Sequence, residues 1–123
     1  MKERRKEPRF RVCDSTFAVD SCEPRRLGRL IDISRSGISF QYMENLDNPQ
    51  PDTELHIFSS THPLFLKSFP FETVYDSPSR VHPKSLLAMR RHGGRFLSLS
   101  AGQQAQLDEF ISLHKVGVAR SSV

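Results

Sequence analysis

Leu27-Gly28-Arg29-Leu30-Ile31-Asp32-Ile33-Ser34-Arg35-Ser36-Gly37-Ile38-Ser39-Phe40-Gln41-Tyr42 contains two strand-like runs separated by a polar turn. Residues 27–33 alternate, with Leu27, Arg29, Ile31 and Ile33 on one face, and in residues 38–42 every second position is apolar, which is the period of a strand with one buried face. Residues 34–37 carry the serine and glycine typical of a turn. The stretch therefore predicts a β-hairpin. On strict alternation, Ile31 and Ile33 point into the protein, and Asp32 and Ser34 point outward.

Further strand-like segments lie on both sides of this hairpin. Loops are predicted over residues 44–53 and 76–83, which are rich in Asn, Asp, Ser and Pro. Pro70 indicates an edge strand or a break within its segment. The expected strands are one starting at Phe10 and ending near Cys22, then Glu54–Phe58, Phe65–Tyr75, Ser85–Arg91 and Arg95–Ser98, with a hairpin turn at His92-Gly93-Gly94 between the last two.

The pattern changes to a helical period at the end of the chain. Ser100 and Gln103 have the spacing of a capping box. Leu107, Phe110, Ile111 and His114 then recur at helical spacing and form one docking face. Because no strand–helix–strand alternation precedes this helix, we expect a mostly β protein. The expected fold is a small antiparallel barrel of six or seven strands with one C-terminal helix.

The positive charge of the chain is concentrated at its N-terminus. The net charge is +4, and residues 1–11 contain six basic and two acidic side chains, so the rest sums to zero. We therefore expect a flexible basic arm over residues 1–9, a β-barrel with its helix over residues 10–116, and a frayed tail over residues 117–123. Such an arm suits an anionic partner, although a solvated leader is the plain alternative.

Several functional classes lack support in the sequence. Cys13 and Cys22 lack metal-ligand spacing and fit reduced, packed thiols. The five histidines show no metal spacing, and no nucleophile motif suggests an enzyme. No apolar segment is long enough to span a membrane, and the charged N-terminus is unlike a signal peptide. We expect a cytoplasmic protein without catalytic activity, metal or cofactor.

Two motifs suggest a family. Arg5-Lys6-Glu7-Pro8-Arg9, preceded by Arg4, and Asp32-Ile33-Ser34-Arg35-Ser36-Gly37 together resemble the paired signatures of the bacterial PilZ domain, an Arg-x-x-x-Arg arm and an Asp/Asn-x-Ser-x-x-Gly turn. The segment Gly94–Leu99 and the helix after it are similar to the end of that domain. The resemblance covers roughly residues 4 to 113, and it is weakest over residues 44–80. It implies a receptor for cyclic di-GMP.

The chemistry of that ligand suits these residues. Guanine presents two acceptors that a guanidinium meets bidentately and two donors that a carboxylate accepts, and its phosphates attract arginine. By resemblance, Arg5 and Arg9 hold phosphate and guanine, while Asp32, Ser34 and Gly37 form the guanine-reading turn. Gly37 would supply a positive φ or clearance for a base. Arg35 would point at the same ligand, and Arg4 would accompany a stacked ligand dimer.

The predicted function is a cyclic di-GMP sensor. Its arm would change conformation on binding and signal to an unidentified effector protein. One alternative is a ligand-independent adaptor on the same fold, in which Asp32 and Ser34 only cap the turn. Another is a nucleic-acid binder using the arm, which the neutral remainder of the chain argues against. We expect a monomer or a weak dimer.

Overall fold

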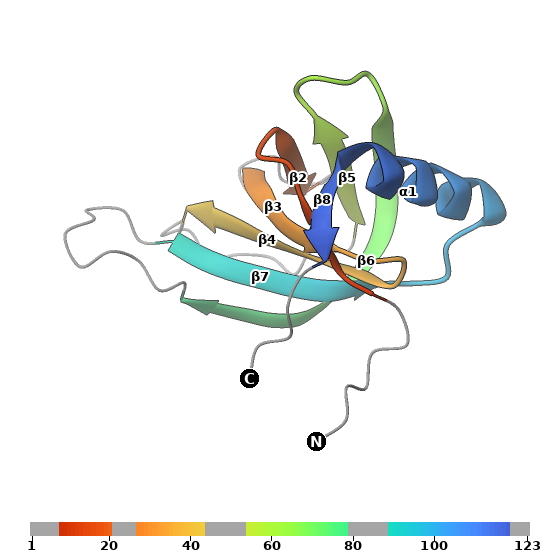
Figure 1. Cartoon of the computed structure of the whole chain (residues 1–123). Coiled ribbons are helices and arrows are strands. Elements are labelled where there is room, and N and C mark those ends of the chain that lie inside the picture. Colours follow the sequence, from red (N-terminus) through yellow and green to blue (C-terminus); the bar gives the residue numbers. More distant parts are fainter. Residues whose placement is uncertain (1–7, 21–26, 44–53, 79–88, 119–123) are drawn as a thin grey trace.

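The computed structural model describes residues 8–20, 27–43, 54–78 and 89–118. These residues form eight strands and one helix (Figure 1). The elements in chain order are β1 (Phe10–Val12), β2 (Thr16–Asp20), β3 (Leu27–Ile33), β4 (Gly37–Met43), β5 (Glu54–Ser59), β6 (Phe65–Pro78), β7 (Met89–Phe96), α1 (Ala101–His114) and β8 (Lys115–Val118).

Six of the strands close into an antiparallel barrel. Their order is β2-β5-β6-β7-β4-β3, and pairing between β2 and β3 joins the two ends. β1 pairs with β3, and β8 pairs with β1, so these two strands extend the sheet beyond the barrel. The predicted fold class is therefore confirmed, and so is the hairpin of β3 and β4. Closure removes free strand edges from the barrel itself.

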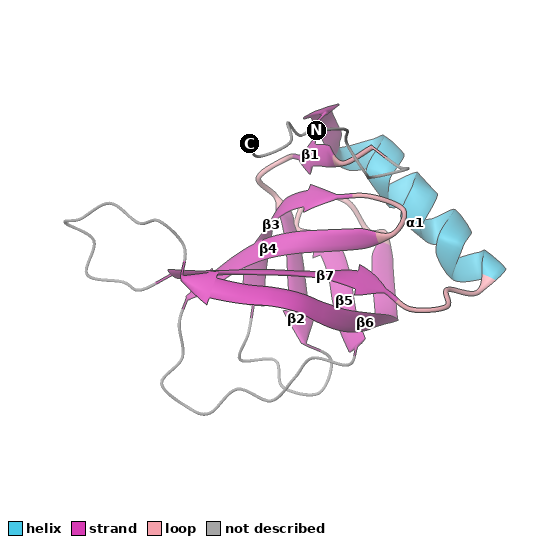
Figure 2. Ribbon diagram, turned by 90° about the horizontal axis from the view of Figure 1, so that it is seen from below, coloured by secondary structure: helices cyan, strands magenta, loops and turns pink. Residues whose placement is uncertain are grey.

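Alternating side chains fill the interior of the barrel. Phe40, Phe69 and Phe71 are almost fully buried there, together with aliphatic residues from neighbouring strands. The helix adds Leu107, Phe110 and Ile111 to the same core, and α1 lies beside one end of the barrel (Figure 2). Burial of this apolar surface stabilises the fold and fixes the position of the helix against the strands.

Both ends of α1 are held by specific contacts. The predicted capping box is present: Ser100 accepts a hydrogen bond from the Gln103 amide, and the Gln103 side chain accepts one from the Ser100 amide. At the other end, the Cys13 amide donates to the His114 carbonyl oxygen at 3.0 Å. The free Cys13 thiol lies 3.6 Å from Nδ1 of His114. The helix is thus tied to the chain between β1 and β2. Cys22 lies outside the described residues.

The hairpin turn predicted at His92-Gly93-Gly94 is wrong. These residues lie in the middle of the continuous strand β7, paired with β4 on one side and β6 on the other. The two glycines serve close packing. A Cβ on Gly93 would collide with the Tyr75 ring, and one on Gly94 with the Glu72 carbonyl oxygen and the Phe71 ring. The predicted strand residues 85–88 lie outside the described residues.

Strict alternation along β3 is also wrong. The register between β3 and β4 shifts between Leu30 and Asp32, which places Leu30 opposite Phe40 and Asp32 opposite Ser39. Ile31 occupies the irregular position and is only partly buried, whereas Leu30 and Ile33 are both buried in the core. A β-bulge adds one residue to one strand and so exchanges the faces beyond it. Asp32 nevertheless faces outward, as predicted.

Other strand boundaries differ from the expected ones. The first predicted strand is broken between β1 and β2, where the Thr16 hydroxyl donates to the Cys13 carbonyl oxygen. β6 continues through Pro70 and includes residues 76–78, which were expected in a loop. Gly117 and Val118, expected in a frayed tail, belong to β8. Within the described residues, no helix is long and apolar enough to cross a membrane.

Candidate ligand-binding site

The site is built around Asp32, whose carboxylate lies on the outer wall of the barrel. The β3–β4 register places Ser39 directly opposite it, and the Ser39 hydroxyl donates to Oδ1 of Asp32 at 2.9 Å. Asp32 is only 6% exposed and Ser39 is fully buried. Both residues lie outside the core, so neighbouring side chains must cover them. A buried carboxylate needs hydrogen bonds and positive charge around it.

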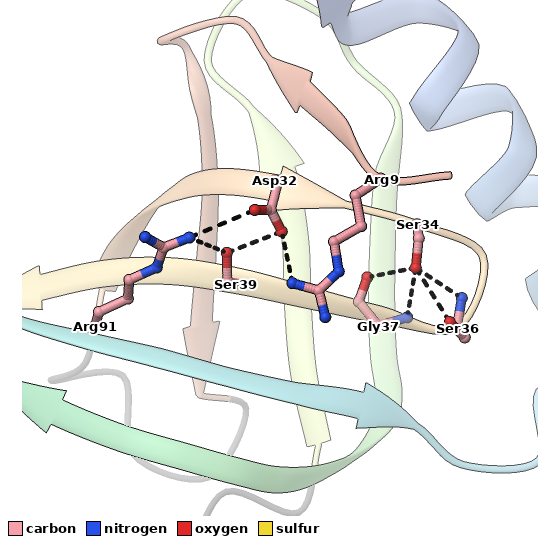
Figure 3. A network of polar contacts seen from close by, with 7 residues as sticks. All are labelled: Arg9, Asp32, Ser34, Ser36, Gly37, Ser39 and Arg91. Carbon is pink, nitrogen blue, oxygen red and sulfur yellow. Dashed lines mark hydrogen bonds and ion pairs between the residues drawn. The ribbon is translucent and has the colours of Figure 1, made fainter. Parts of the chain in front are cut away.

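Two arginines from distant segments supply that positive charge (Figure 3). Nη1 of Arg9, just before β1, lies 3.6 Å from Oδ1 of Asp32. Nη2 of Arg91, on β7, lies 3.5 Å from Oδ2 of Asp32 and 3.5 Å from the Ser39 hydroxyl. Two guanidinium groups around one carboxylate leave one positive charge in excess. The arrangement therefore suits an anionic ligand that also carries hydrogen-bond donors for the carboxylate.

Ser34 lies inside the turn that follows Asp32. Its hydroxyl oxygen accepts hydrogen bonds from the amides of Ser36 at 3.2 Å and Gly37 at 3.1 Å, and the Ser34 amide donates to the Gly37 carbonyl oxygen at 2.8 Å. Ser34 is 2% exposed. This geometry favours the alternative in which the serine shapes the turn. The predicted contact between Ser34 and a ligand stays a prediction.

The positive φ predicted for Gly37 is wrong, whereas the predicted clearance for a base stays a prediction. No glycine in the described ranges has a positive φ. Gly37 pairs with Arg95 at the start of β4, and a Cβ on it would collide with the Gly94 carbonyl oxygen. The missing side chain thus allows β4 and β7 to approach each other. The space next to Gly37 is occupied by the backbone of β7. The glycine is therefore explained by strand packing and not by the positive φ that was expected.

Arg35, at the tip of the same turn, points toward the helix. Its Nε donates to Oδ1 of Asp108 at 3.0 Å, and the Gln104 side chain donates to the same oxygen at 3.2 Å. Both partners of the ion pair are about half exposed, at 54% and 48%, so its net contribution to stability is at most about 1 kcal/mol. The pair joins the Asp-x-Ser-x-x-Gly turn to α1. A contact between Arg35 and a ligand remains a prediction.

Three residues of this face were missed by sequence reasoning. Ser39 and Arg91 contact Asp32 as described above. The third is Tyr75 of β6, whose ring lies across Gly93, and Gly93 in turn pairs with Ser39. The outer face thus runs from Asp32 through Ser39 and Gly93 to an aromatic ring. Alternation along an unbroken β7 would have placed Arg91 and Gly93 on one face, but the erroneous turn concealed it.

Arg4 and Arg5 lie outside the described residues. Of the predicted set, the structure brings together Arg9 and Asp32, and it places Ser34, Arg35 and Gly37 in the adjoining turn. Over the same ranges, no group of three or more His, Cys, Asp or Glu side chains is arranged to hold a metal ion.

A second polar network lies between β4, β6 and β7. Oδ2 of Asp76 accepts a hydrogen bond from the Tyr42 hydroxyl at 2.6 Å and lies 3.1 Å from Nδ1 of His92, and Oδ1 accepts one from Nε of Arg90 at 2.6 Å. Burial raises the pKa of Asp76, but the Tyr42 and Arg90 hydrogen bonds and the charges of His92 and Arg90 outweigh it, so the pKa is lowered. His92 also stacks on Phe40, with ring centroids 5.0 Å apart. This network joins the barrel strands through buried polar contacts.

Comparisons with known proteins agree with this architecture. The PilZ domain profile matches residues 3–113. The fold is similar to the PilZ domain of Escherichia coli YcgR, solved with c-di-GMP, with a TM-score of 0.68, 16% identity and coverage of 90% of this chain and 91% of that one. It is also similar to the K. pneumonia MrkH–c-di-GMP complex, with a TM-score of 0.67, 14% identity and coverage of 91% of this chain.

The chain spans only part of the larger of these proteins. It covers 52% of the MrkH chain and 46% of the YcgR chain in a second E. coli structure, a complex with c-di-GMP that is 18% identical with a TM-score of 0.62. No curated protein matches the sequence. The profile match covers most of the chain and includes both motifs and the closing helix. The chain therefore belongs to the PilZ domain family.

Proposed function

We propose that this chain is a receptor for cyclic di-GMP that binds the dinucleotide on the outer face of β3, β4 and β7. The observation that carries the proposal is the meeting of Arg9 and Asp32 at 3.6 Å. These residues come from two motifs 23 positions apart in the sequence, and each motif supplies a group that guanine needs. The proposal is further supported by the c-di-GMP complexes of the fold relatives.

The excess positive charge of the site fits the ligand's phosphates. In this proposal, the Asp32 carboxylate accepts hydrogen bonds from the donor edge of one guanine. Arg9 and Arg91 turn from Asp32 to phosphate or to the guanine acceptors. Each charge-assisted hydrogen bond is worth about 1.5–3 kcal/mol. Micromolar affinity requires about 8 kcal/mol net. Several such contacts must therefore act together, and Arg4 and Arg5 of the arm are proposed to supply the others.

We further propose that binding is coupled to signalling through the N-terminal arm. Residues 1–9 would close over the ligand, since Arg9 already lies at the site and the other arginines of the motif directly precede it. Ordering a segment on binding changes the surface offered to a partner protein. The protein would act in the bacterial cytoplasm as a sensor that passes the signal to an effector, without catalysing a reaction.

Calorimetric titration of the purified chain tests the proposal. We expect cyclic di-GMP to bind with at least micromolar affinity and cyclic di-AMP to bind far more weakly, because adenine lacks the N1–H and N2–H donors for Asp32. Asp32→Asn should reduce this discrimination while keeping the fold, which circular dichroism would verify. Absence of heat and of thermal stabilisation at high cyclic di-GMP concentration would refute the proposal. Equal affinity for both dinucleotides in the unmodified protein would refute the role of Asp32.

A further inference from the structure

The outer face of β2, β5 and β6 carries a ladder of aromatic side chains. Phe17 on β2 pairs directly with Phe58 on β5, and Phe58 pairs with Phe65 on β6. The ring centroids are 5.7 Å apart in the first pair and 6.0 Å in the second, within the range of favourable aromatic contact. The ring centroid of His56 lies 5.2 Å from that of Phe65, so His56 adds a further ring to the ladder.

A second apolar row runs beside this ladder. Val19 of β2 pairs with His56 on one side and with Leu27 of β3 on the other. Leu27 is 52% exposed and Phe65 is 45% exposed, while Phe17, Val19 and Phe58 are partly exposed. Outward positions of an antiparallel sheet are normally polar. We call these six residues the aromatic face: Phe17, Val19, Leu27, His56, Phe58 and Phe65.

Cations border the aromatic face on opposite sides. Arg29 of β3 pairs with Phe17, and Lys67 of β6 follows Phe65 by two positions. Both side chains are exposed, and neither makes an ion pair with another residue in the described part of the chain. The acidic side chain along the same outer row of β5 is Glu54, which is partly buried. The border is therefore net positive, with a cation on each flank.

We propose that the aromatic face docks an amphipathic helix of a partner protein whose apolar stripe is bordered by carboxylates on both sides. Aromatic residues are enriched at the centres of protein interfaces. Arg29 and Lys67 would favour a partner whose apolar stripe is bordered by negative charge. The partner cannot add a strand here, because β2 and β5 are each paired on both edges within the barrel. The docked element must therefore be held by its side chains.

The aromatic face is distinct from the proposed ligand site. In the barrel order, β2 and β5 lie on the opposite side from β4 and β7, which carry Ser39 and Arg91. A partner on the aromatic face therefore leaves the face around Asp32 open. The inference concerns a second surface, and it stands whether or not the chain binds a dinucleotide.

The test uses synthetic helical peptides about 18 residues long, or five turns. One peptide has a leucine stripe bordered by glutamate, the second has the same stripe bordered by lysine, and the third has the glutamate composition in scrambled order. Binding to the whole chain is followed by fluorescence anisotropy and by amide chemical-shift mapping. We expect the glutamate-bordered peptide alone to bind, with shifts centred on Phe17, Phe58 and Phe65.

Variants of exposed residues avoid loss of the fold. The double variant Arg29→Glu/Lys67→Glu should weaken binding of the glutamate-bordered peptide about ten-fold, and Arg11→Glu/Lys115→Glu, with the same change in net charge, should leave it unchanged. Leu27→Ser/Phe65→Ser should abolish binding, whereas Val74→Ser/Val116→Ser, at residues 63% and 61% exposed, should not.

Two results would overturn the proposal. The first is equal binding of the lysine-bordered peptide, or an undiminished affinity in Arg29→Glu/Lys67→Glu, because either would remove the charge selection. The second is concentration-dependent self-association in sedimentation that Leu27→Ser/Phe65→Ser abolishes, since a second copy of the chain would then be the occupant.

Discussion

At the scale of single residues, the site depends on one carboxylate shared by two arginines. Arg9 lies beside Oδ1 of Asp32 and Arg91 beside Oδ2. The Ser39 hydroxyl donates a hydrogen bond to Oδ1 and so helps to orient the carboxylate. Removing Asp32 would leave two cations close together, whereas removing one arginine leaves the carboxylate with the other. The three charged groups therefore act as a coupled set whose single substitutions are not additive.

Arg9→Ala and Arg91→Ala should each weaken cyclic di-GMP binding by about 1.5–3 kcal/mol, roughly ten- to hundred-fold. The reason is the loss of one charge-assisted contact to phosphate or guanine. Titration calorimetry measures the effect, and Lys67→Ala serves as the matched control because Lys67 is exposed on β6, which is not adjacent to β3 and Asp32 in the barrel order. An Arg91→Ala affinity equal to that of the unmodified protein would show that Arg91 only supports Asp32 in the empty site.

Asp76 should give the fold an acid-sensitive component of stability. Its pKa in the folded protein lies below the ordinary value of 3.8. A carboxyl group with a lowered folded-state pKa stabilises the fold above its unfolded-state pKa and loses that contribution as the pH falls through the folded-state value. Urea unfolding at several pH values should therefore show the difference in stability between the unmodified chain and Asp76→Asn shrinking below about pH 4. A difference that stays constant from pH 6 to about pH 2.5 would contradict this assignment.

At the scale of elements, the glycines of β4 and β7 decide how the strands pack. Gly37, Gly93 and Gly94 each occupy a position where a side chain would strike a neighbouring strand. Gly102, in the first turn of α1, differs from them: the nearest heavy atom to a Cβ there is the Ser100 hydroxyl oxygen at 3.9 Å. A side chain added at one of these barrel glycines would therefore clash with a neighbouring strand, whereas a side chain added at Gly102 would not.

Gly37→Ala should destabilise the protein by about 1–3 kcal/mol, because the strands must separate to admit the methyl group. Gly102→Ala is the matched control and should stabilise by about 0.5 kcal/mol through the higher helix propensity of alanine. Thermal or urea unfolding measures both. Equal effects of the two substitutions on the free energy of unfolding would mean that β4 and β7 can separate to admit the methyl group without loss of stability.

At the scale of the whole molecule, the closed barrel separates two surfaces. The face around Asp32 is polar and positively charged, whereas the aromatic face on β2, β5 and β6 is apolar with a cationic border. The Arg35–Asp108 ion pair joins the turn after Asp32 to α1, and the C-terminal end of α1 is tied to Cys13. If the chain binds a dinucleotide and a partner as proposed, this layout leaves room for both at the same time.

The proposed closure of the arm predicts a change in protease sensitivity. Trypsin should cleave after Lys2, Arg4, Arg5 or Lys6 in the free protein, and saturating cyclic di-GMP should slow this cleavage several-fold, since cleavage requires an accessible, locally unfolded segment. Mass spectrometry of timed digests identifies the sites. Cleavage of an unrelated protein substrate added to the same digest serves as the control for a general effect on the protease. Unchanged cleavage of the arm at saturation would exclude closure.

The sequence by itself determined the fold class, the hairpin of β3 and β4, the capped C-terminal helix and the outward position of Asp32. These features follow from local periods and from residue types with strong local preferences, which act whatever the rest of the chain does. By resemblance, the two motifs also predicted that Arg9 and Asp32 act together, and the structure places the two side chains 3.6 Å apart, whereas their role in binding a ligand stays a prediction. The same resemblance predicted the roles of Arg4, Arg5 and the arm, and residues 1–7 lie outside the described residues.

Only the tertiary structure decided the partners of these residues. The local pattern of His92-Gly93-Gly94 predicts a turn. It carries no information about the Tyr75 and Phe71 rings, which pack against the two glycines in the folded protein. The β3 bulge, the ion pair of Arg91 with Asp32 and the aromatic ladder likewise depend on the register between strands that are distant in the chain. Register is fixed by barrel closure and side-chain packing, which are properties of the whole fold and leave no local pattern in the sequence.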